Sequence, residues 1–240
     1  MDLNGKLVLL TGGTDGIGLR LARQLRGKGA IVIVTGRTPE RIEAARCEGF
    51  EVISADLATS EGVAGLLAHV AGRPIDVLVN NAGMGAAHDY RAAMPDAAAD
   101  ERTLQLNVHA PFRLIAGLMD TLRARPEAMI VNVTSGLAIA PNTASAIYCA
   151  TKAALRSYTI ALREQLKATR IHVLEVLPPV VETAMTTDLH MKKLSPEACA
   201  AEIVTAMQRN ADKANVGQVK FLRVVYSLSP ALARRLMLAF

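Results

Sequence analysis

Tryptophan is absent from this 240-residue chain, and aromatic residues make up only 3% of it. The hydrophobic share is nevertheless 51%, so it consists mainly of Ala, Leu, Val and Ile. Such a composition suits parallel strands that are covered by helices on both faces. A chain of this length can bury a large core within one domain. We therefore expect one α/β domain spanning residues 1–240.

Cysteines are few, and long runs of one charge are missing. Cys47, Cys149 and Cys199 cannot all pair and lack metal-ligand spacing, which predicts a reduced, cytoplasmic protein without a metal site. The net charge is +5, but Lys and Arg are scattered, which argues against nucleic-acid binding. The first residues lack the basic start and apolar core of a signal peptide. The uncharged stretch 128–151 is interrupted by Gly, Pro and polar residues, which argues against a membrane helix.

A strand, a glycine-rich turn and a helix follow one another in residues 6–28. The turn is Thr11-Gly-Gly-Thr-Asp-Gly-Ile-Gly18. Glycines let the backbone approach phosphate groups, and a helix start supplies free amides and the positive end of the helix dipole. The order of elements therefore predicts a dinucleotide site, although the glycine spacing differs from the commoner G-x-G-x-x-G fingerprint. The candidate cofactor-binding residues of this turn are Gly12, Thr14, Gly16, Ile17 and Gly18.

The end of the second strand, 30–35, bears on the choice of cofactor. An acid at this point would bind the adenosine ribose hydroxyl of NAD, but the sequence has Gly36 and Arg37. An arginine can pair with the 2′-phosphate of NADP. Asp15, in the glycine turn, places an acid near the same region. We expect NADP to be the preferred cofactor and keep NAD as the alternative.

Polar residues also follow the third and fourth predicted strands, 50–54 and 75–79. The first of these strands is followed by Asp56 and Leu57, and the second by Asn80-Asn81-Ala82-Gly83. Ligands of doubly wound sheets bind at the carboxyl ends of the strands. Asp56 would fit equally well as a helix N-cap.

Two polar residues of the following segment, His88 and Asn107, are expected in different surroundings. His88 lies in an irregular loop over 84–95, and we expect it at the surface. Asn107 lies inside a helix predicted over 100–122, where asparagine is unfavourable. Its side chain needs polar partners, which makes it a candidate structural or relay group.

The candidate catalytic residues lie in the segment 135–152. Tyr148 and Lys152 are four apart on a predicted helix, so they project from one face. An ammonium beside a phenolate favours its charged form and is expected to lower the pKa of Tyr148 from about 10 toward neutrality, where acid-base catalysis is efficient. Ser135, after the strand 129–134, can hydrogen-bond a substrate oxygen in the same cleft. By itself this pair is better explained as a half-buried aromatic and a solvated charge, and only the other motifs of the chain favour the catalytic interpretation.

Together the motifs resemble the short-chain dehydrogenase/reductase family over nearly the whole chain. The matching residues are Thr11-Gly12-x-x-x-Gly16-Ile17-Gly18, Asp56, Asn80-Asn81-Ala82-Gly83, Asn107, Ser135 and Tyr148-x-x-x-Lys152. The resemblance implies an α/β fold, a Rossmann-type doubly wound parallel sheet of seven strands flanked by helices, with NAD(P) across its C-terminal edge. It also implies hydride transfer between nicotinamide and a small-molecule carbonyl or secondary alcohol.

The resemblance also implies roles for individual residues. Tyr148 would be the general acid or base, and Lys152 would lower its pKa and hold the nicotinamide ribose. Ser135 would orient the substrate carbonyl, and Asn107 would hold a water in a proton relay with Lys152. The remaining expected cofactor contacts are Asp56 and Leu57 at adenine, Asn80, Ala82 and Gly83 on the adenosine side, and Val181 and Thr183 near the nicotinamide. Pro179 stands where the family usually has glycine, which leaves the local backbone path open.

The segment 184–195 corresponds to the family's substrate lid. Its apolar residues, Met185, Leu189, Met191 and Leu194, would make an adaptable pocket for an apolar substrate, and plain packing explains each of them equally well. A 3-oxoacyl thioester reductase of the same family and a non-catalytic NAD(P) sensor are the alternatives. The complete set of four catalytic residues argues against a sensor.

Residues 217–240 form an expected amphipathic C-terminal extension. Its apolar residues Phe221, Leu222, Val225 and Leu228 have helical spacing, and Ser229-Pro230 begins another short helix. The charged residues Lys220, Arg223, Arg234 and Arg235 are all basic. This pattern favours contact within a homo-oligomer, a dimer or tetramer, with peripheral membrane contact as the second interpretation.

Overall fold

Seven parallel strands form the centre of the molecule. The structure is a computed structural model that describes residues 1–85, 87–94, 96–188 and 191–239. Within these residues the strand order is β3-β2-β1-β4-β5-β6-β7. The bounds are β1 Leu7–Leu10, β2 Ile31–Gly36, β3 Glu51–Ser54, β4 Val77–Asn80, β5 Ala128–Val133, β6 Ile171–Leu177 and β7 Lys213–Asn215. The predicted seven-stranded, Rossmann-type sheet is confirmed, and its order reverses between β1 and β4, where such sheets bind ligands.

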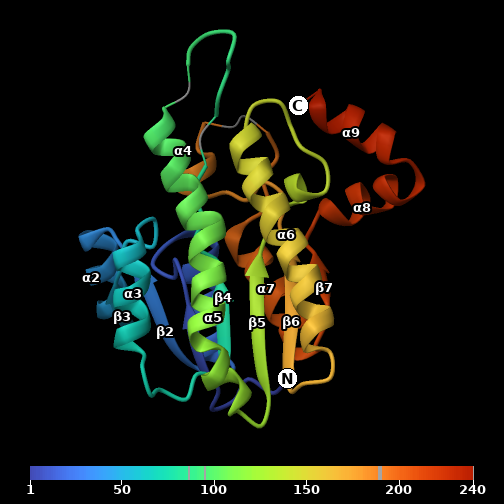
Figure 1. Ribbon diagram of the computed structural model, residues 1–240. Coiled ribbons are helices and arrows are strands. Elements are labelled where there is room, and N and C mark those ends of the chain that lie inside the picture. Colours follow the sequence, from blue (N-terminus) through green and yellow to red (C-terminus); the bar gives the residue numbers. More distant parts are fainter. Residues whose placement is uncertain (86, 95, 189–190, 240) are drawn as a thin grey trace.

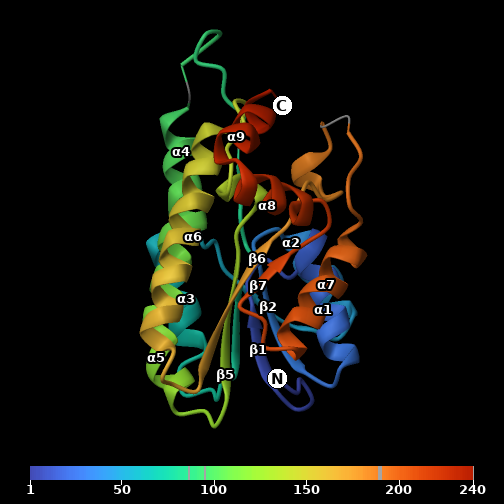
Figure 2. The same cartoon turned by 90° about the vertical axis from the view of Figure 1, so that its right-hand side faces the viewer.

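Helices cover both faces of this sheet (Figures 1 and 2). One face carries α1 Gly16–Gly27, α2 Pro39–Cys47 and α7 Pro196–Gln208, and the other carries α3 Ser60–His69, α5 Ala110–Arg123 and α6 Ala146–Leu166. Alternate residues of β1 pack into two separate cores: Val8 and Leu10 lie under α1, whereas Leu9 lies under α3 and α5. Burial on both sides explains why β1 is continuously apolar instead of alternating.

The helix predicted over 100–122 is longer and not uniform. It consists of α4 Ala97–Leu104, a π-turn η1 Gln105–His109 and α5. It begins earlier because the side chain of Asp96 accepts hydrogen bonds from the amides of Ala98 and Ala99, as an N-cap does. The π-turn contains Asn107, and such turns within helices occur frequently at functional sites.

The remaining elements lie at the end of the sheet where the strands finish (Figures 1 and 2). They are the short helices η2 Gly136–Ala138 and η3 Ala184–Thr186, and the C-terminal helices α8 Val219–Leu228 and α9 Pro230–Leu238. The two C-terminal helices are as predicted, with Ser229 capping α9. Of the helices in the described part of the chain, none combines the length and apolar character needed to cross a bilayer.

Candidate active site

The glycine-rich turn after β1 is packed so tightly that side chains are excluded from it. Gly12 has a φ of +65°, and a Cβ added there would lie 2.9 Å from the Cα of Ala82. A Cβ on Gly18 would lie 2.1 Å from the carbonyl oxygen of Gly12. Both positions therefore need glycine, for backbone conformation at the first and for space at the second. The resulting bare backbone leads directly into the N-terminus of α1.

The turn after β4 is held against this glycine turn by Asn81, which was not among the predicted cofactor-binding residues. Asn81 donates from Nδ2 to the carbonyl oxygens of Thr11 and Gly12, at 3.0 and 3.1 Å. The Thr11 hydroxyl accepts the amides of Asn81 and Ala82 in return. The side chain of Asn80, which we expected toward the cofactor, instead bonds Asn132 within the sheet at 2.8 Å. The reason is that Asn80 is the last residue of β4 and points to the same face as Leu78, toward the core beneath α5 and α6.

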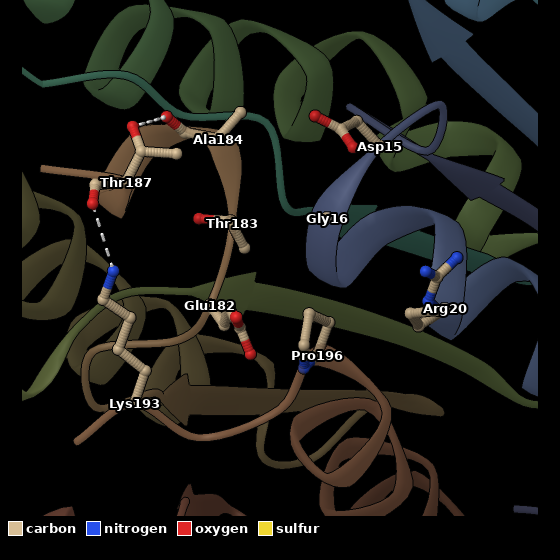
Figure 3. Close-up of a pocket in the computed structure, with 9 residues that line it drawn as sticks. All are labelled: Asp15, Gly16, Arg20, Glu182, Thr183, Ala184, Thr187, Lys193 and Pro196. Atoms are coloured by element: carbon tan, nitrogen blue, oxygen red, sulfur yellow. Dashed lines mark hydrogen bonds between the residues drawn. The ribbon is translucent and has the colours of Figure 1, made fainter.

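A cavity of about 410 Å³ opens between the start of α1 and the segment after β6 (Figure 3). It is lined by Asp15, Gly16, Arg20, Glu182, Thr183, Ala184, Thr187, Lys193 and Pro196. Gly16 and Thr183 lie close together in its wall: a Cβ on Gly16 would lie 3.1 Å from Cγ2 of Thr183. Free backbone amides at a helix start, beside a turn that has no side chains, suit the diphosphate of a dinucleotide. The residues present therefore fit the nicotinamide cofactor that the turn predicts.

The edge of the site near β2 and β3 carries paired charges. Arg37 follows β2 and is exposed. Arg41 on α2 binds Asp15 at 2.8 Å, so the acid of the glycine turn is already neutralised by a partner. Asp56 accepts from Arg102 on α4 at 2.8 Å and from the amide of Ala58 at 3.1 Å. Partial burial is the largest single influence and acts to raise the pKa of Asp56, but the hydrogen bonds from Arg102 and the Ala58 amide, together with the charges of Arg102 and Arg37, lower this pKa on balance.

Several other predicted cofactor residues form the core around the cradle. Thr14 is buried beside Gly36, since a Cβ on that glycine would lie 2.6 Å from the Thr14 side chain. Leu57 is buried in the core beneath α3, and Ile17 packs on the core beneath α1. The side chains of Thr14 and Leu57 are buried and that of Ile17 is partly buried, so backbone atoms provide most of the surface that these residues offer to a cofactor.

Tyr148 and Lys152 lie on α6, one turn apart, as their spacing predicts. Lys152 is buried, its Nζ donates to the carbonyl oxygen of Val133 at the end of β5, at 2.9 Å, and it lies 5.7 Å from the centre of the Tyr148 ring. Ser135 follows β5 and lies beside Tyr148, whose phenol it hydrogen-bonds. A Cβ on Gly83 would lie 3.3 Å from both Lys152 Nζ and Asn107 Oδ1. The four predicted catalytic residues thus meet at one end of the sheet.

The expected lowering of the Tyr148 pKa is wrong for this structure. Burial raises the pKa of Tyr148 to about 12, and the hydrogen bond with Ser135 opposes this only in part. Burial also lowers the pKa of Lys152 to about 8. The physical cause is that the site is poorly hydrated, and poor hydration disfavours the phenolate and the ammonium alike. Tyr148 is therefore a protonated phenol, ready to donate a proton.

Asn107 holds the loop that follows the β4 turn. Its Oδ1 accepts from the amide of Met84 at 3.0 Å, and its Nδ2 donates to the carbonyl oxygen of Met84 at 2.7 Å and to the Thr151 hydroxyl at 3.0 Å. The prediction that this asparagine needs polar partners is confirmed. Its fully used side chain fixes the loop next to Lys152.

His88 is not the surface residue that we expected. Its side chain is 9% exposed, and its Nε2 lies 2.7 Å from Oδ1 of Asp100 on α4. Its backbone amide donates to the carbonyl oxygen of Ala144, in the segment before α6. No local pattern marks this contact, because His88 and Asp100 belong to a loop and a helix that only the tertiary fold brings together.

The segment after β6 closes the cavity. Val181 forms an isolated parallel bridge with Leu194, and its carbonyl oxygen accepts from the Thr186 hydroxyl at 2.6 Å. Lys193 donates to the carbonyl oxygens of Thr186 and Thr187. Figure 3 shows the bond to Thr187. The backbone path after Pro179 thus brings Thr183 to the cavity. Leu189, another predicted lid residue, lies outside the described residues.

A dinucleotide cradle that ends at a half-buried Tyr148 and a buried Lys152 defines an oxidoreductase that uses a nicotinamide cofactor. Among the side chains that the structure describes, no cluster of His, Cys, Asp and Glu is suited to hold a metal ion. A family model described as short chain dehydrogenase matches residues 6–194. The chain belongs to the short-chain dehydrogenase/reductase family.

Relatives and solved structures agree with this assignment. The chain is 38% identical over 189 residues to an uncharacterized oxidoreductase, DltE, of Bacillus subtilis, covering 77% of this chain and 75% of that protein. It is 27% identical over 248 residues to a fatty acyl-CoA reductase of Acinetobacter baylyi, covering 98% and 84%. A short chain dehydrogenase from Burkholderia cenocepacia, solved in complex with NADP, superposes with a TM-score of 0.87 at 25% identity, covering 99% of both chains.

Proposed function

We propose that this protein is an NADP-preferring enzyme that reduces a carbonyl group, or oxidises the corresponding secondary alcohol, with Tyr148 as general acid or base. The observation that carries the proposal is the meeting of Asn107, Ser135, Tyr148 and Lys152 around Gly83, at the end of the dinucleotide cradle. A protein that only sensed the cofactor would have no need of a proton donor.

Each residue then has a part in the reaction. When bound, the nicotinamide supplies the hydride. Ser135 orients the carbonyl, and Tyr148 donates its proton to the carbonyl oxygen, so that charge does not accumulate there. The Lys152 ammonium stabilises the phenolate that remains. Asn107 holds Met84 and so keeps the loop wall in place, with a water relay to Lys152 as a further part of the proposal.

Arg37 supports the preference for NADP. It is exposed at the end of β2, where the 2′-phosphate would lie, whereas Asp15 is occupied by Arg41. An acid that is already paired rejects a phosphate less strongly than a free one. The NADP in the Burkholderia cenocepacia relative is in line with this preference. NAD remains the alternative cofactor.

An apolar substrate is part of the proposal. Met185 and Met191 are 52% and 44% exposed in the lid, and Leu194 is half-buried beside them. Flexible methionine side chains adapt to apolar ligands. The name of the Acinetobacter baylyi relative, a fatty acyl-CoA reductase, is compatible with an acyl-type substrate, and a 3-oxoacyl thioester reductase is the specialised form of this proposal.

The organisation of the protein follows from the same proposal. Residues 1–240 are a single catalytic domain, with 184–195 as the lid and 217–240 as a C-terminal extension. Leu104 and Ile160 expose apolar side chains on α4 and α6, and this face suits a homo-oligomer, a dimer or tetramer. All three cysteines are free thiols, in keeping with a reduced cytoplasmic protein.

The test is oxidation of NADPH and NADH in the presence of ketones, aldehydes, quinones and 3-oxoacyl thioesters, with the natural protein and Tyr148→Phe side by side. Loss of general acid catalysis is expected to lower turnover about 10²- to 10⁴-fold in the variant. Equal binding of NADPH by both proteins, measured by fluorescence, is the control for the fold. Turnover that survives in Tyr148→Phe would contradict the assigned role, and cofactor binding without any turnover would favour the sensor.

A further inference from the structure

Helix α8 carries apolar side chains on two faces, and only one of them is packed. The packed face consists of Val219, Leu222 and Tyr226, which lie over Ile139 and Leu177. The other face consists of Phe221, Val224 and Leu228, which are 71%, 56% and 83% exposed. Because these three recur at intervals of three and four residues, they form one stripe along the helix. The packed face alone would hold α8 on the domain, so the outer stripe calls for another explanation.

Helix α9 also exposes large apolar side chains. Leu232 and Leu236 are 49% and 44% exposed and are one turn apart. The two helices contact each other and stand out from the domain beside the end of the sheet (Figures 1 and 2). We call Phe221, Val224, Leu228, Leu232 and Leu236 the α8–α9 face. Several large apolar side chains on adjoining helices amount to an exposed patch of the kind that marks an interaction surface.

The charges around the α8–α9 face are of one sign. After Asp212 the sequence contains five basic residues and no Asp or Glu. Lys220 is paired with Glu202 at 2.7 Å, while Arg234 and Arg235 on α9 are exposed. A second copy docked here by twofold symmetry would bring together two surfaces whose charged residues after Asp212 are all basic. An anionic partner is therefore favoured over a second copy of the chain.

Other exposed apolar side chains lie at the same end of the molecule. Tyr90 and Met94 are in the loop before α4, and Met185 and Met191 are in the lid. This loop, the lid and α9 all reach past the strand ends at the mouth of the site (Figures 1 and 2). The loop, the lid and α9 are three separate protruding segments. A broad surface can contact all three at once more readily than a peptide in a groove can. Apolar side chains flanked by basic ones on a short helix are typical of a helix that lies in a membrane interface.

We propose that the α8–α9 face docks on an anionic phospholipid bilayer, with the mouth of the active site turned toward the lipid. The packed face of α8 lies directly on the active-site loop: a Cβ on Gly136, next to Ser135, would lie 2.9 Å from Cγ2 of Val219. The docked stripe is thus about one helix diameter, ~10 Å, from that loop. An apolar substrate would then reach the site from the membrane. This route rests on the proposed function, whereas the docking itself is independent of it.

The experiment is co-sedimentation of the full-length protein with phosphatidylcholine vesicles that contain about a third phosphatidylglycerol, at low and high salt, compared with phosphatidylcholine alone. Phe221→Ser/Leu228→Ser is expected to weaken binding about a hundredfold. In the natural protein both apolar side chains would be buried in the bilayer interface, and the double variant loses that burial. Arg234→Gln/Arg235→Gln is expected to weaken it about thirtyfold, since each basic residue near an anionic surface contributes about a fivefold factor. Added salt should weaken binding of the natural protein.

Matched controls come from the rest of the chain. Ile31→Thr changes an apolar residue that is 59% exposed at the opposite end of the sheet. Lys28→Gln/Arg46→Gln removes two exposed positive charges far from α8 and α9. Both controls are expected to bind vesicles like the natural protein. Circular dichroism and NADPH binding of every variant check the fold, and the assay needs no turnover, so its outcome is independent of the proposed activity.

Three results would overturn the proposal. The first is equal sedimentation with neutral and anionic vesicles, which would remove the role of the arginines. The second is unchanged vesicle binding of Phe221→Ser/Leu228→Ser. The third is a fall in the molar mass of this double variant, measured by sedimentation equilibrium without lipid, because the α8–α9 face would then be a subunit interface. Binding that needs anionic lipid and is lost in both double variants supports the proposal.

Discussion

Gly85 lies against the ring of Tyr148. A methyl group on Gly85 would come within 2.7 Å of Cδ2 and 3.1 Å of Cγ of this ring, closer than carbon atoms pack. Position 85 must therefore stay free of a side chain for Tyr148 to keep its place. Asn107 fixes the neighbouring residue, Met84, through both of its backbone groups. The loop wall and the proton donor are thus positioned together.

Gly85→Ala tests this contact. We expect a fall in turnover of about 10- to 100-fold, because a small displacement of a catalytic group is costly. The matched control is Gly65→Ala on the exposed side of α3, where an added Cβ meets no atom within 4 Å. This control should keep full activity and gain about 0.5–1 kcal/mol in the free energy of unfolding. Full activity of Gly85→Ala in a steady-state assay would show that the ring has room to move.

The pH dependence of carbonyl reduction should follow Lys152 rather than Tyr148. The pKa of Lys152 is lowered to about 8 and that of Tyr148 is raised to about 12. As the pH rises through about 8, Lys152 loses the charge that stabilises the phenolate, while Tyr148 keeps its proton. We therefore expect kcat/KM for reduction to fall with an apparent pKa near 8, since kcat/KM reports the free enzyme. A profile that stays flat to about pH 10 would argue against this assignment.

The burial of Lys152 in the site is expected to lower the free energy of unfolding of the protein. Its pKa falls from 10.5 to about 8 on folding, so the folded state disfavours the charged form. This penalty is full below about pH 8, shrinks as the pH rises toward 10.5, and vanishes above it. Lys152→Met should therefore raise the free energy of unfolding near pH 7 by up to about 3 kcal/mol, at about 1.4 kcal/mol per tenfold change in proton affinity.

Urea unfolding at several pH values measures this effect. The gain from Lys152→Met should diminish between about pH 8 and 10.5, while turnover is lost at every pH. Lys28→Met, at an exposed position after α1, is the control and should show no such trend. A variant that is less stable than the natural protein near neutral pH would mean that the bond to Val133 outweighs the burial of the charge.

Arg37→Gln should change the choice of cofactor. The loss of a charged hydrogen bond to the 2′-phosphate, worth about 1.5–3 kcal/mol, is expected to raise KM for NADPH about 10- to 100-fold. KM for NADH should change little, because NADH lacks that phosphate. Arg41→Gln is the comparison, since this arginine is held by Asp15 at 2.8 Å. If Arg41→Gln caused the larger loss for NADPH, Arg41 would be the phosphate partner instead.

Elements and motif spacing could be read from the sequence because they depend on neighbouring residues. The strand predicted over 50–54 is observed as Glu51–Ser54, and the helix that begins at Ala146 carries Tyr148 and Lys152 one turn apart. The C-terminal helices also follow from local spacing. The seven-stranded sheet, by contrast, was implied by the resemblance of the motifs to a family.

Contacts between distant segments were missed or misjudged. The choice of Asn80 instead of Asn81 depended on which residue ends β4, since adjacent residues of a strand point to opposite faces. The pairs His88–Asp100 and Asp56–Arg102 join a loop or strand end to α4, and no spacing along the chain reveals them. The direction of the Tyr148 pKa shift was wrong because burial, unlike the presence of a nearby lysine, has no local signature.

The sequence by itself determined that this protein has strands buried on both faces, a dinucleotide turn and a Tyr–Lys pair, because periodicity and glycine placement act over a few residues. Only the tertiary structure decided what surrounds those groups. It showed that the surroundings of Tyr148 raise its pKa, that Gly85 lies against its ring, and that α8 packs with Leu222 and leaves Phe221 exposed to solvent. The physical reason is that hydration and packing are set by atoms from remote parts of the chain, which only the folded arrangement brings together.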